Sequence, residues 1–232
     1  MGFFVCQFAV KGLEVQTTQF LAVVRHGLSE ANANLAMTAC GLFYSRSGSD
    51  RSVPLTHEGH RQAREVGKRL ARKFPRPQKV AAIYHSRFTR VSDTALAIQN
   101  KLPYKVKLIG DERLNKRSYG KFWNLTHLGV ETLYPDEWKR YQREGDLHYR
   151  APGGENYFDL FARVDAFIDE LSATTTGNVV VVTSSATMLS FQRRLEGLTD
   201  EELVRRYEAQ FLPNAHVLLY GRASSTSPFS PL

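Results

Sequence analysis

The chain has 232 residues and a mass of 26.3 kDa, and its 42% hydrophobic and 23% charged residues fit a folded core and exclude a disordered protein. Its apolar runs are far shorter than the roughly 18 residues that a spanning helix needs, which excludes an integral membrane protein. The two cysteines, Cys6 and Cys40, indicate no disulfide framework, although a single bridge between them stays open. We therefore expect an intracellular protein, in the cytoplasm or the mitochondrion.

The sequence indicates one domain with two short extensions. Residues 1–17 form an N-terminal extension, which is apolar at its start but lacks the basic region and cleavage site of a secretory signal. Residues 18–221 carry the predicted domain. Residues 222–232 are a Ser/Pro-rich tail, which we expect to be flexible because it has few apolar groups to bury.

Along the predicted domain, short β-branched runs alternate with longer amphipathic stretches, which is typical of an α/β fold. Several of the short runs are continuously apolar, as in strands that are buried on both faces, so we expect helices on both sides of a sheet. The predicted strands are Phe20–Arg25, Val80–His85, Tyr104–Leu108, Asn178–Thr183 and His216–Tyr220.

Three helices stand out from their periodicity and capping residues. The clearest covers His57–Phe74, with Thr56 as its N-cap and apolar residues at spacings of three and four. Another covers Asp159–Leu171 with a similar apolar stripe. A third begins at Thr199, which forms a capping box with Glu202.

The net charge of +8 is concentrated in one segment of the chain. Eight basic residues and a single acid, Glu65, give residues 61–79 a local charge of +7. We call the eight the basic strip: Arg61, Arg64, Lys68, Arg69, Arg72, Lys73, Arg76 and Lys79. A solvated helix face explains it as well as a docking surface does; the docking partner could be RNA, an acidic protein surface or anionic lipid.

Residues suited to phosphate chemistry follow three of the predicted strands. Arg25 and His26 come at the end of the first strand, Arg87 and Arg90 after the second, and Ser184 after the fourth. In an open parallel sheet these ends share one edge. Arginine binds phosphate bidentately, and a neutral histidine can attack phosphorus, so a phosphate site is predicted there. The alternative is a histidine that only packs and arginines on a solvated helix.

The segment Arg25-His26-Gly27, followed by Ser29 and Asn32, resembles the opening motif of the histidine phosphatase (phosphoglycerate mutase-like) superfamily. The resemblance covers about residues 18–221, and residues 149–155 look most like the fructose-2,6-bisphosphatase branch. Further matching segments are residues 54–63, 86–95, 113–120, 152–155 and 179–182.

This resemblance implies a three-layer α/β/α sandwich with a mostly parallel central sheet. His26 would be the nucleophile that accepts the phosphoryl group. Arg25 and Arg90 would clamp the phosphoryl oxygens, whose charge needs stabilisation in the transition state, and Asn32 would donate from the same loop. The resemblance implies no metal and no cofactor.

Two positions depart from the family pattern. Lys116 stands where the family has a glutamate that protonates the leaving oxygen, and Ser184 stands where it has a second histidine. A lysine, with a usual pKa near ~10.4, is a poor proton donor at neutral pH, and serine supplies no cationic donor. Both side chains are expected to line the phosphate pocket, and Lys116 should make it more positive.

Other residues could replace the missing groups or contact the substrate. Glu112, Glu155 and His85 are candidates for the lost acid or histidine, although a structural role is favoured for each. Arg150 and Glu155 are candidates for the substrate pocket. Fructose-2,6-bisphosphate is not the predicted ligand, because other pocket positions of that branch are not matched.

The sequence leaves three functional hypotheses. The first is a catalytically impaired pseudoenzyme that serves as a structural or docking subunit of a larger assembly and keeps an anion pocket. The second is a slow phosphomonoesterase or phosphotransferase that acts through a phosphohistidine at His26. The third is a phospho-ligand sensor.

Overall fold

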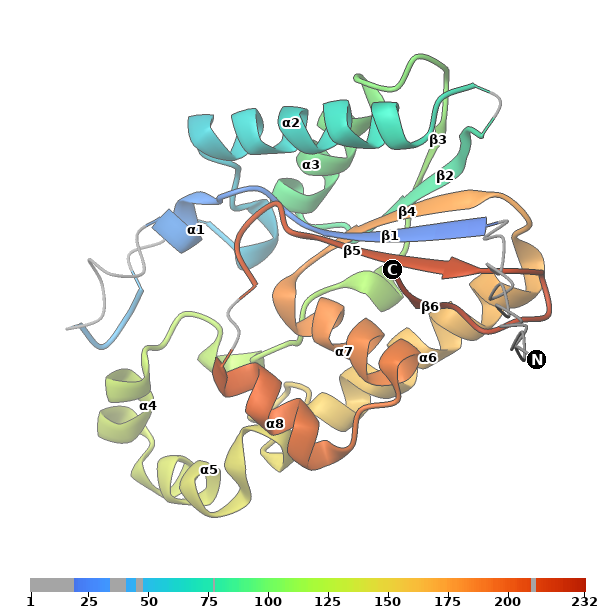
Figure 1. Ribbon diagram of the computed structural model, residues 1–232. Coiled ribbons are helices and arrows are strands. Elements are labelled where there is room, and N and C mark those ends of the chain that lie inside the picture. The colour runs from blue at the N-terminus through green and yellow to red at the C-terminus, as the bar shows by residue number, and fades with distance from the viewer. Residues whose placement is uncertain (1–18, 34–40, 45–47, 77, 210–211) are drawn as a thin grey trace, which may run out of the picture.

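The computed structural model describes residues 19–33, 41–44, 48–76, 78–209 and 212–232 (Figure 1). The predicted N-terminal extension and both cysteines lie outside the described residues. Within the described ranges, no helix combines the length and the apolar character that crossing a bilayer requires.

The centre of the molecule is one six-stranded sheet in the order β3-β2-β4-β1-β5-β6. The four strands β3, β2, β4 and β1 run parallel, whereas β5 and β6 are antiparallel to their neighbours. This arrangement confirms the predicted α/β fold with a mostly parallel sheet. The strands are β1 (Gln19–Arg25), β2 (Val80–His85), β3 (Lys107–Gly110), β4 (Asn178–Thr183), β5 (Val217–Arg222) and β6 (Ser230–Pro231).

Helices cover both faces of the sheet and make three layers (Figure 1). One face carries α2 (His57–Lys73) and α3 (Thr89–Gln99), and the other carries α6 (Tyr157–Thr174) and α7 (Ser185–Glu196). The remaining helices are α1 (Glu30–Ala33), α4 (His127–Leu133), α5 (Pro135–His148) and α8 (Asp200–Ala209), with single 3-10 turns at Asp50–Ser52, Glu112–Leu114 and Gly120–Phe122.

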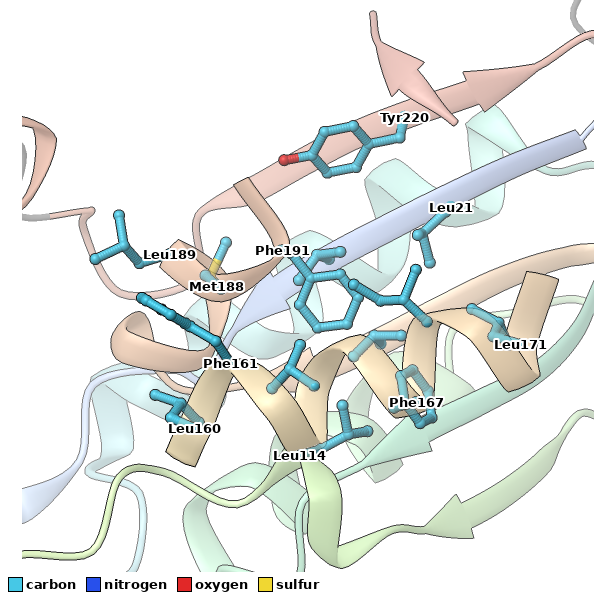
Figure 2. Packing of buried hydrophobic residues seen from close by; sticks show 14 of the residues in the cluster. Leu21, Leu114, Leu160, Phe161, Phe167, Leu171, Met188, Leu189, Phe191 and Tyr220 are labelled. Carbon is cyan, nitrogen blue, oxygen red and sulfur yellow. The ribbon is translucent and has the colours of Figure 1, made fainter. Parts of the chain in front are cut away.

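The valine run of β4 shows why the two layers form. Val179 and Val181 belong to the core beneath α6 and α7, whereas Val180 and Val182 belong to the core beneath α2 and α3. Successive side chains of a strand point to opposite faces, so a central strand needs apolar residues at every position. Figure 2 shows the first of these cores, in which Phe167 and Phe191 lie between the helices and the sheet.

A third, smaller core lies under α4 and α5, in the segment between β3 and α6. Its buried members are Phe122, Val130, Tyr149 and Ala151. Trp138 and Tyr141 of α5 are partly buried and pack against this cluster.

The predicted helices are confirmed, with adjusted ends. The Thr56 hydroxyl accepts a hydrogen bond from the Gly59 backbone N–H and begins α2. Thr199 and Glu202 form the reciprocal capping bonds in front of α8. The helix predicted at Asp159–Leu171 begins earlier, because Asn156 is the N-cap of α6.

Two predicted strands are shifted along the chain. Tyr104 lies before β3, because its hydroxyl donates to the Phe74 carbonyl at 2.7 Å and accepts from the Val80 N–H at 3.0 Å. These two hydrogen bonds hold Tyr104 outside the β2–β3 pairing, which starts at Lys107. Strand β5 runs two residues beyond the prediction, to Arg222.

The prediction of a flexible tail is wrong. Residues 230–231 form β6, which pairs with β5, and Leu232 donates to the Leu219 carbonyl at 3.0 Å. Phe229 is only 4% exposed and belongs to the core beneath α6 and α7. The buried Phe229 ring and the backbone bonds to β5 therefore order the end of a segment that is otherwise rich in serine and proline.

Candidate active site

The loop after β1 is held tightly against the start of α2. Gly27 allows this approach, because a Cβ atom there would lie 2.4 Å from the Gly59 carbonyl oxygen. The Gly27 N–H donates to the Thr94 hydroxyl at 3.1 Å, and the Leu28 N–H donates to the Gln62 side chain at 2.9 Å. The backbone on both sides of His26 is thereby fixed.

His26 is presented as a neutral nucleophile. Its Nδ1 atom lies 2.7 Å from the Gly27 carbonyl oxygen, which can only accept, so Nδ1 carries the proton and Nε2 keeps its lone pair. Burial, followed by the nearby charge of Arg90, lowers the pKa of His26 to about 3. The ring therefore stays uncharged throughout the neutral range.

This low pKa makes the stability of the fold depend on pH. Below pH 6.5 the unfolded histidine binds a proton that the folded one refuses, so acidification favours unfolding until the folded pKa is reached. Between pH 7 and pH 5 we expect His26 to cost about 2 kcal/mol of unfolding free energy. Urea denaturation at both pH values should show a smaller loss for His26→Asn than for the wild type, and equal losses would contradict the assignment.

Two arginines flank the nucleophile. Arg25 is buried at the end of β1 and donates to the Leu212 carbonyl, and burial lowers its pKa to about 10, which still leaves it charged at neutral pH. Arg90 lies in the first turn of α3, is 5% exposed, and stacks on the Phe88 ring at 4.9 Å. The predicted clamp residues are thus brought together by two different strand ends.

Asn32 is oriented by polar neighbours on the loop. Its Oδ1 accepts from the Ser29 hydroxyl at 2.9 Å and from the Asn214 amide at 3.4 Å. Asn214 also donates to the His26 carbonyl at 3.1 Å. Because the Asn32 oxygen accepts both bonds, its amide nitrogen is the end that can donate to an anion.

A carboxylate that the sequence analysis did not single out lies against the clamp. Asp50 accepts from Arg90 through its backbone oxygen at 2.7 Å and through Oδ1 at 3.1 Å, and its Oδ2 lies 2.5 Å from Lys116 Nζ. Asp50 offsets the positive charge that Lys116 brings, and a pocket more positive than that of an active relative stays a prediction. Arg25, Arg90, Lys116 and Asp50 together leave two excess positive charges, which match a phosphate dianion.

The two residues that depart from the family pattern, Lys116 and Ser184, also line the pocket. Lys116 Nζ lies 5.1 Å from the centre of the Tyr119 ring, in addition to its ion pair with Asp50. Ser184 is the N-cap residue of α7, and its hydroxyl lies 3.2 Å from the Thr187 hydroxyl. Neither residue can supply the carboxylic acid or the imidazolium that the family pattern has at its position.

The candidate replacements have structural partners. Burial raises the pKa of Glu155, but the hydrogen bonds from Arg163 and the Ser118 N–H outweigh it and lower the pKa overall, so Glu155 stays ionised. Glu112 is exposed and pairs with Arg51 at 3.5 Å. His85 Nδ1 lies 2.9 Å from the Ser86 carbonyl oxygen. Of the three, Glu155 alone is among the pocket residues.

Arg150, the other substrate-pocket candidate, is not brought to the site. It is exposed, pairs with Asp159 at 2.6 Å and does not line the cavity. Arg117 is there instead: it is buried, donates to Asp146 at 3.0 Å and stacks on the Tyr157 ring at 4.4 Å. Its position directly after Lys116 was the available signal for it.

These groups surround a cavity of about 310 Å³. One side is polar and holds the nucleophile, the clamp and Asp50. Much of the remaining lining, which the sequence analysis did not predict, is aromatic and aliphatic: Tyr44, Tyr119, Phe122, Leu125, His127, Val130, Trp138, Tyr141, Tyr149 and Ala151. Among the residues that the structure describes, no group of three His, Cys, Asp or Glu side chains is placed to share a metal ion.

The sequence of this chain is similar to those of known phosphoryl-transfer proteins. The family model of the histidine phosphatase superfamily (branch 1) matches residues 21–221. A 2,3-bisphosphoglycerate-dependent phosphoglycerate mutase 2 from Gloeobacter violaceus is 29% identical over 197 residues, which cover 82% of this chain and 81% of the mutase.

Solved structures share the fold at lower identity. The α-ribazole phosphatase of Shigella flexneri superposes with a TM-score of 0.69 at 19% identity, covering 92% of this chain and 96% of that one. The mycobacterial glucosyl-3-phosphoglycerate phosphatase has a TM-score of 0.67 at 21% identity, covering 90% and 94%. At these identities the likeness shows a common fold, and the particular resemblance to the fructose-2,6-bisphosphatase branch stays a prediction.

Proposed function

Because the chain belongs to the histidine phosphatase superfamily, branch 1, we propose that its cavity binds phosphate monoesters and that His26 accepts the phosphoryl group in a catalytically impaired reaction. The observation that carries the proposal is the state of His26: a buried, neutral ring whose Nδ1–H is bound to Gly27 and whose Nε2 is available beside Arg90.

The reaction follows from these groups. The Nε2 lone pair attacks phosphorus, an N–P bond forms, and the bond from phosphorus to the ester oxygen breaks. Arg25 and Arg90 stabilise the charge on the phosphoryl oxygens. Water then attacks the phosphohistidine, which releases inorganic phosphate and restores His26.

The impairment lies in the fate of the leaving oxygen. Asp50 pairs with Arg90 and Lys116, Glu155 with Arg163, and Asp146 with Arg117, so the three carboxylates of the cavity are stabilised in their ionised form. Loss of general acid catalysis costs roughly 10²- to 10⁴-fold in rate. An alkyl ester, whose alkoxide needs a proton as it leaves, should turn over slowly.

The test combines binding with trapping. Inorganic phosphate binding is measured by calorimetry, and a phosphoryl group on the protein is sought by intact mass spectrometry after mixing with a phosphate monoester. We expect Arg90→Ala to lose phosphate binding and His26→Asn to lose the label. His85→Asn is the matched control, since His85 ends β2, which is separated from β1 by β4, and lies outside the cavity.

The outcomes separate the remaining hypotheses. A label that persists in His26→Asn, or phosphate binding unaffected by Arg90→Ala, would overturn the proposal. Phosphate binding that needs Arg90 without any label or turnover would instead support the phospho-ligand sensor.

A docking role is the second candidate, and the exposure of the basic strip favours it. All eight basic side chains are exposed on α2 and the segment after it, opposite the buried face of Ala63, Val66 and Leu70. Two of the eight are paired within the helix, Arg61 with Glu58 and Lys68 with Glu65. Whether the strip meets RNA, an acidic protein or anionic lipid stays a prediction, to be tested by comparing binding to each with that of an Arg64→Ala/Arg69→Ala/Arg72→Ala variant.

A further inference from the structure

Part of the cavity lining is built from stacked aromatic rings. Trp138 and Tyr141 of α5 stack with their ring centres 5.3 Å apart and their planes at 24°. His127 of α4 lies 5.5 Å from Trp138, and Tyr149 meets Tyr141 edge-on at 5.3 Å. All four rings line the cavity that also holds His26.

This wall has its own support. Trp138 and Tyr141 rest on the small core of Phe122, Val130, Tyr149 and Ala151, which is separate from the two cores of the sheet. The Tyr149 hydroxyl donates to Glu137 at 2.8 Å, which fixes its ring. The rings are therefore held in place before any ligand enters.

A wall of this kind favours a planar apolar group over a polyol. Aromatic rings gain from stacked and edge-on contacts, whereas hydroxyl groups buried against an apolar wall lose hydrogen bonds to water without replacement. Arg117, a buried cation among the cavity residues, is already bound to Asp146 and stacked on Tyr157.

The missing proton donor leads to the same class of compound. A phenol has an acidity close to that of tyrosine, with a pKa of about 10, whereas an alkyl alcohol is far less acidic and is closer to water. A phenolate can therefore leave without a carboxylic acid at hand. The family's glutamate is replaced by Lys116, which binds Asp50. We expect this loss of a proton donor to lower the turnover of aryl esters far less than that of alkyl esters.

We propose that the substrates of this site are phosphate monoesters of aromatic alcohols, with the ring against Trp138 and Tyr141 and the phosphoryl group between Arg25 and Arg90. The proposal rests on the proposed function above. His26 Nε2 forms the N–P bond as the P–O bond to the ring breaks, and the electron pair leaves on the phenolate oxygen. The phenolate takes its proton from water, and a second water hydrolyses the phosphohistidine.

Three phosphate esters test the effect of the aromatic ring separately from that of the leaving group. Phenyl phosphate has the ring and the good leaving group, 2-phenylethyl phosphate has the ring with an alkyl leaving group, and ethyl phosphate has neither. We expect phenyl phosphate to have a kcat at least about 10²-fold above that of 2-phenylethyl phosphate. Measured as inhibitors, both ring compounds should bind roughly 10-fold more tightly than ethyl phosphate.

A pair of variants locates the ring. Trp138→Ala should weaken binding of both ring compounds several-fold and leave that of ethyl phosphate unchanged. Leu133→Ala is the control, because Leu133 is 44% exposed on the adjacent α4 and does not line the cavity. The wild-type comparison of 2-phenylethyl with ethyl phosphate needs no variant, so the proposal stays testable if Trp138→Ala fails to fold.

The proposal is overturned if ethyl phosphate binds and turns over as well as phenyl phosphate, or if Trp138→Ala weakens all three esters equally. Phosphate binding through Arg90 and labelling of His26 are measured alongside. If those two persist while the ring preference is absent, the substrate class alone is wrong; if they fail, the proposed function falls with it.

Discussion

The double substitution Lys116→Glu/Ser184→His is expected to raise kcat/KM for ethyl phosphate by about 10² or more. It would supply a carboxylic acid for the leaving oxygen and an imidazole for the phosphoryl group, and each kind of group contributes roughly 10²-fold or more. The two gains should not multiply, because groups that act on one transition state are not independent. Turnover is measured from pH 5 to pH 8, with circular dichroism to show that each variant is folded.

The experiment needs a control for Asp50, which lies beside residue 116. Its Oδ2 lies 2.5 Å from Lys116 Nζ, so Lys116→Glu would place a second carboxyl group beside it. Like charges at such a distance raise the pKa of one member of the pair, which favours a proton donor at neutral pH but also strains the loop. The set therefore includes Asp50→Asn in the same background, and His26→Asn must abolish any gain. No gain in either folded background would show that the scaffold lacks more than these two groups.

Phe229→Ala is expected to lower the free energy of unfolding by about 3 to 5 kcal/mol, the usual cost of emptying a buried phenylalanine site. The ring is 4% exposed and packed in the core beneath α6 and α7, and the Arg222 guanidinium lies over it at 4.6 Å. Guanidinium denaturation at pH 7 measures the change. Phe158→Ala is the control: its ring is 39% exposed, so the loss should be about 1 kcal/mol or less. Equal losses in the two variants would show that the tail is not part of the core.

The sequence predicted those parts of the fold that depend on residues close together in the chain. The valines of β4 alternate between two cores, and the Thr56 cap and the apolar stripe behind it define α2. The site residues at strand ends follow from the parallel sheet, which brings Arg25, His26, Arg90 and Ser184 to one cavity. Their catalytic roles stay predictions that the experiments above test.

The rest depends on contacts between distant parts of the chain. Asp50 meets Arg90 and Lys116, which lie 40 and 66 residues further on, and no periodicity or motif around residue 50 indicates either contact. Arg150 fits a family motif by its place in the sequence, yet its side chain pairs with Asp159 outside the cavity. The order of the tail likewise depends on a slot in the core that only the assembled sheet and helices create.

The two residues of β6 also govern what the sheet presents to other chains. An uncovered edge strand offers a row of free backbone donors and acceptors, which is a template for pairing with a second molecule. Here β6 pairs with Tyr220 and Gly221 on the outer side of β5, and it is very short and carries Pro231, whose nitrogen has no hydrogen to donate. A chain cut before Phe229 would make β5 the edge strand and uncover the backbone groups of Leu219, Tyr220 and Gly221, and we expect it to be more prone to edge-to-edge aggregation.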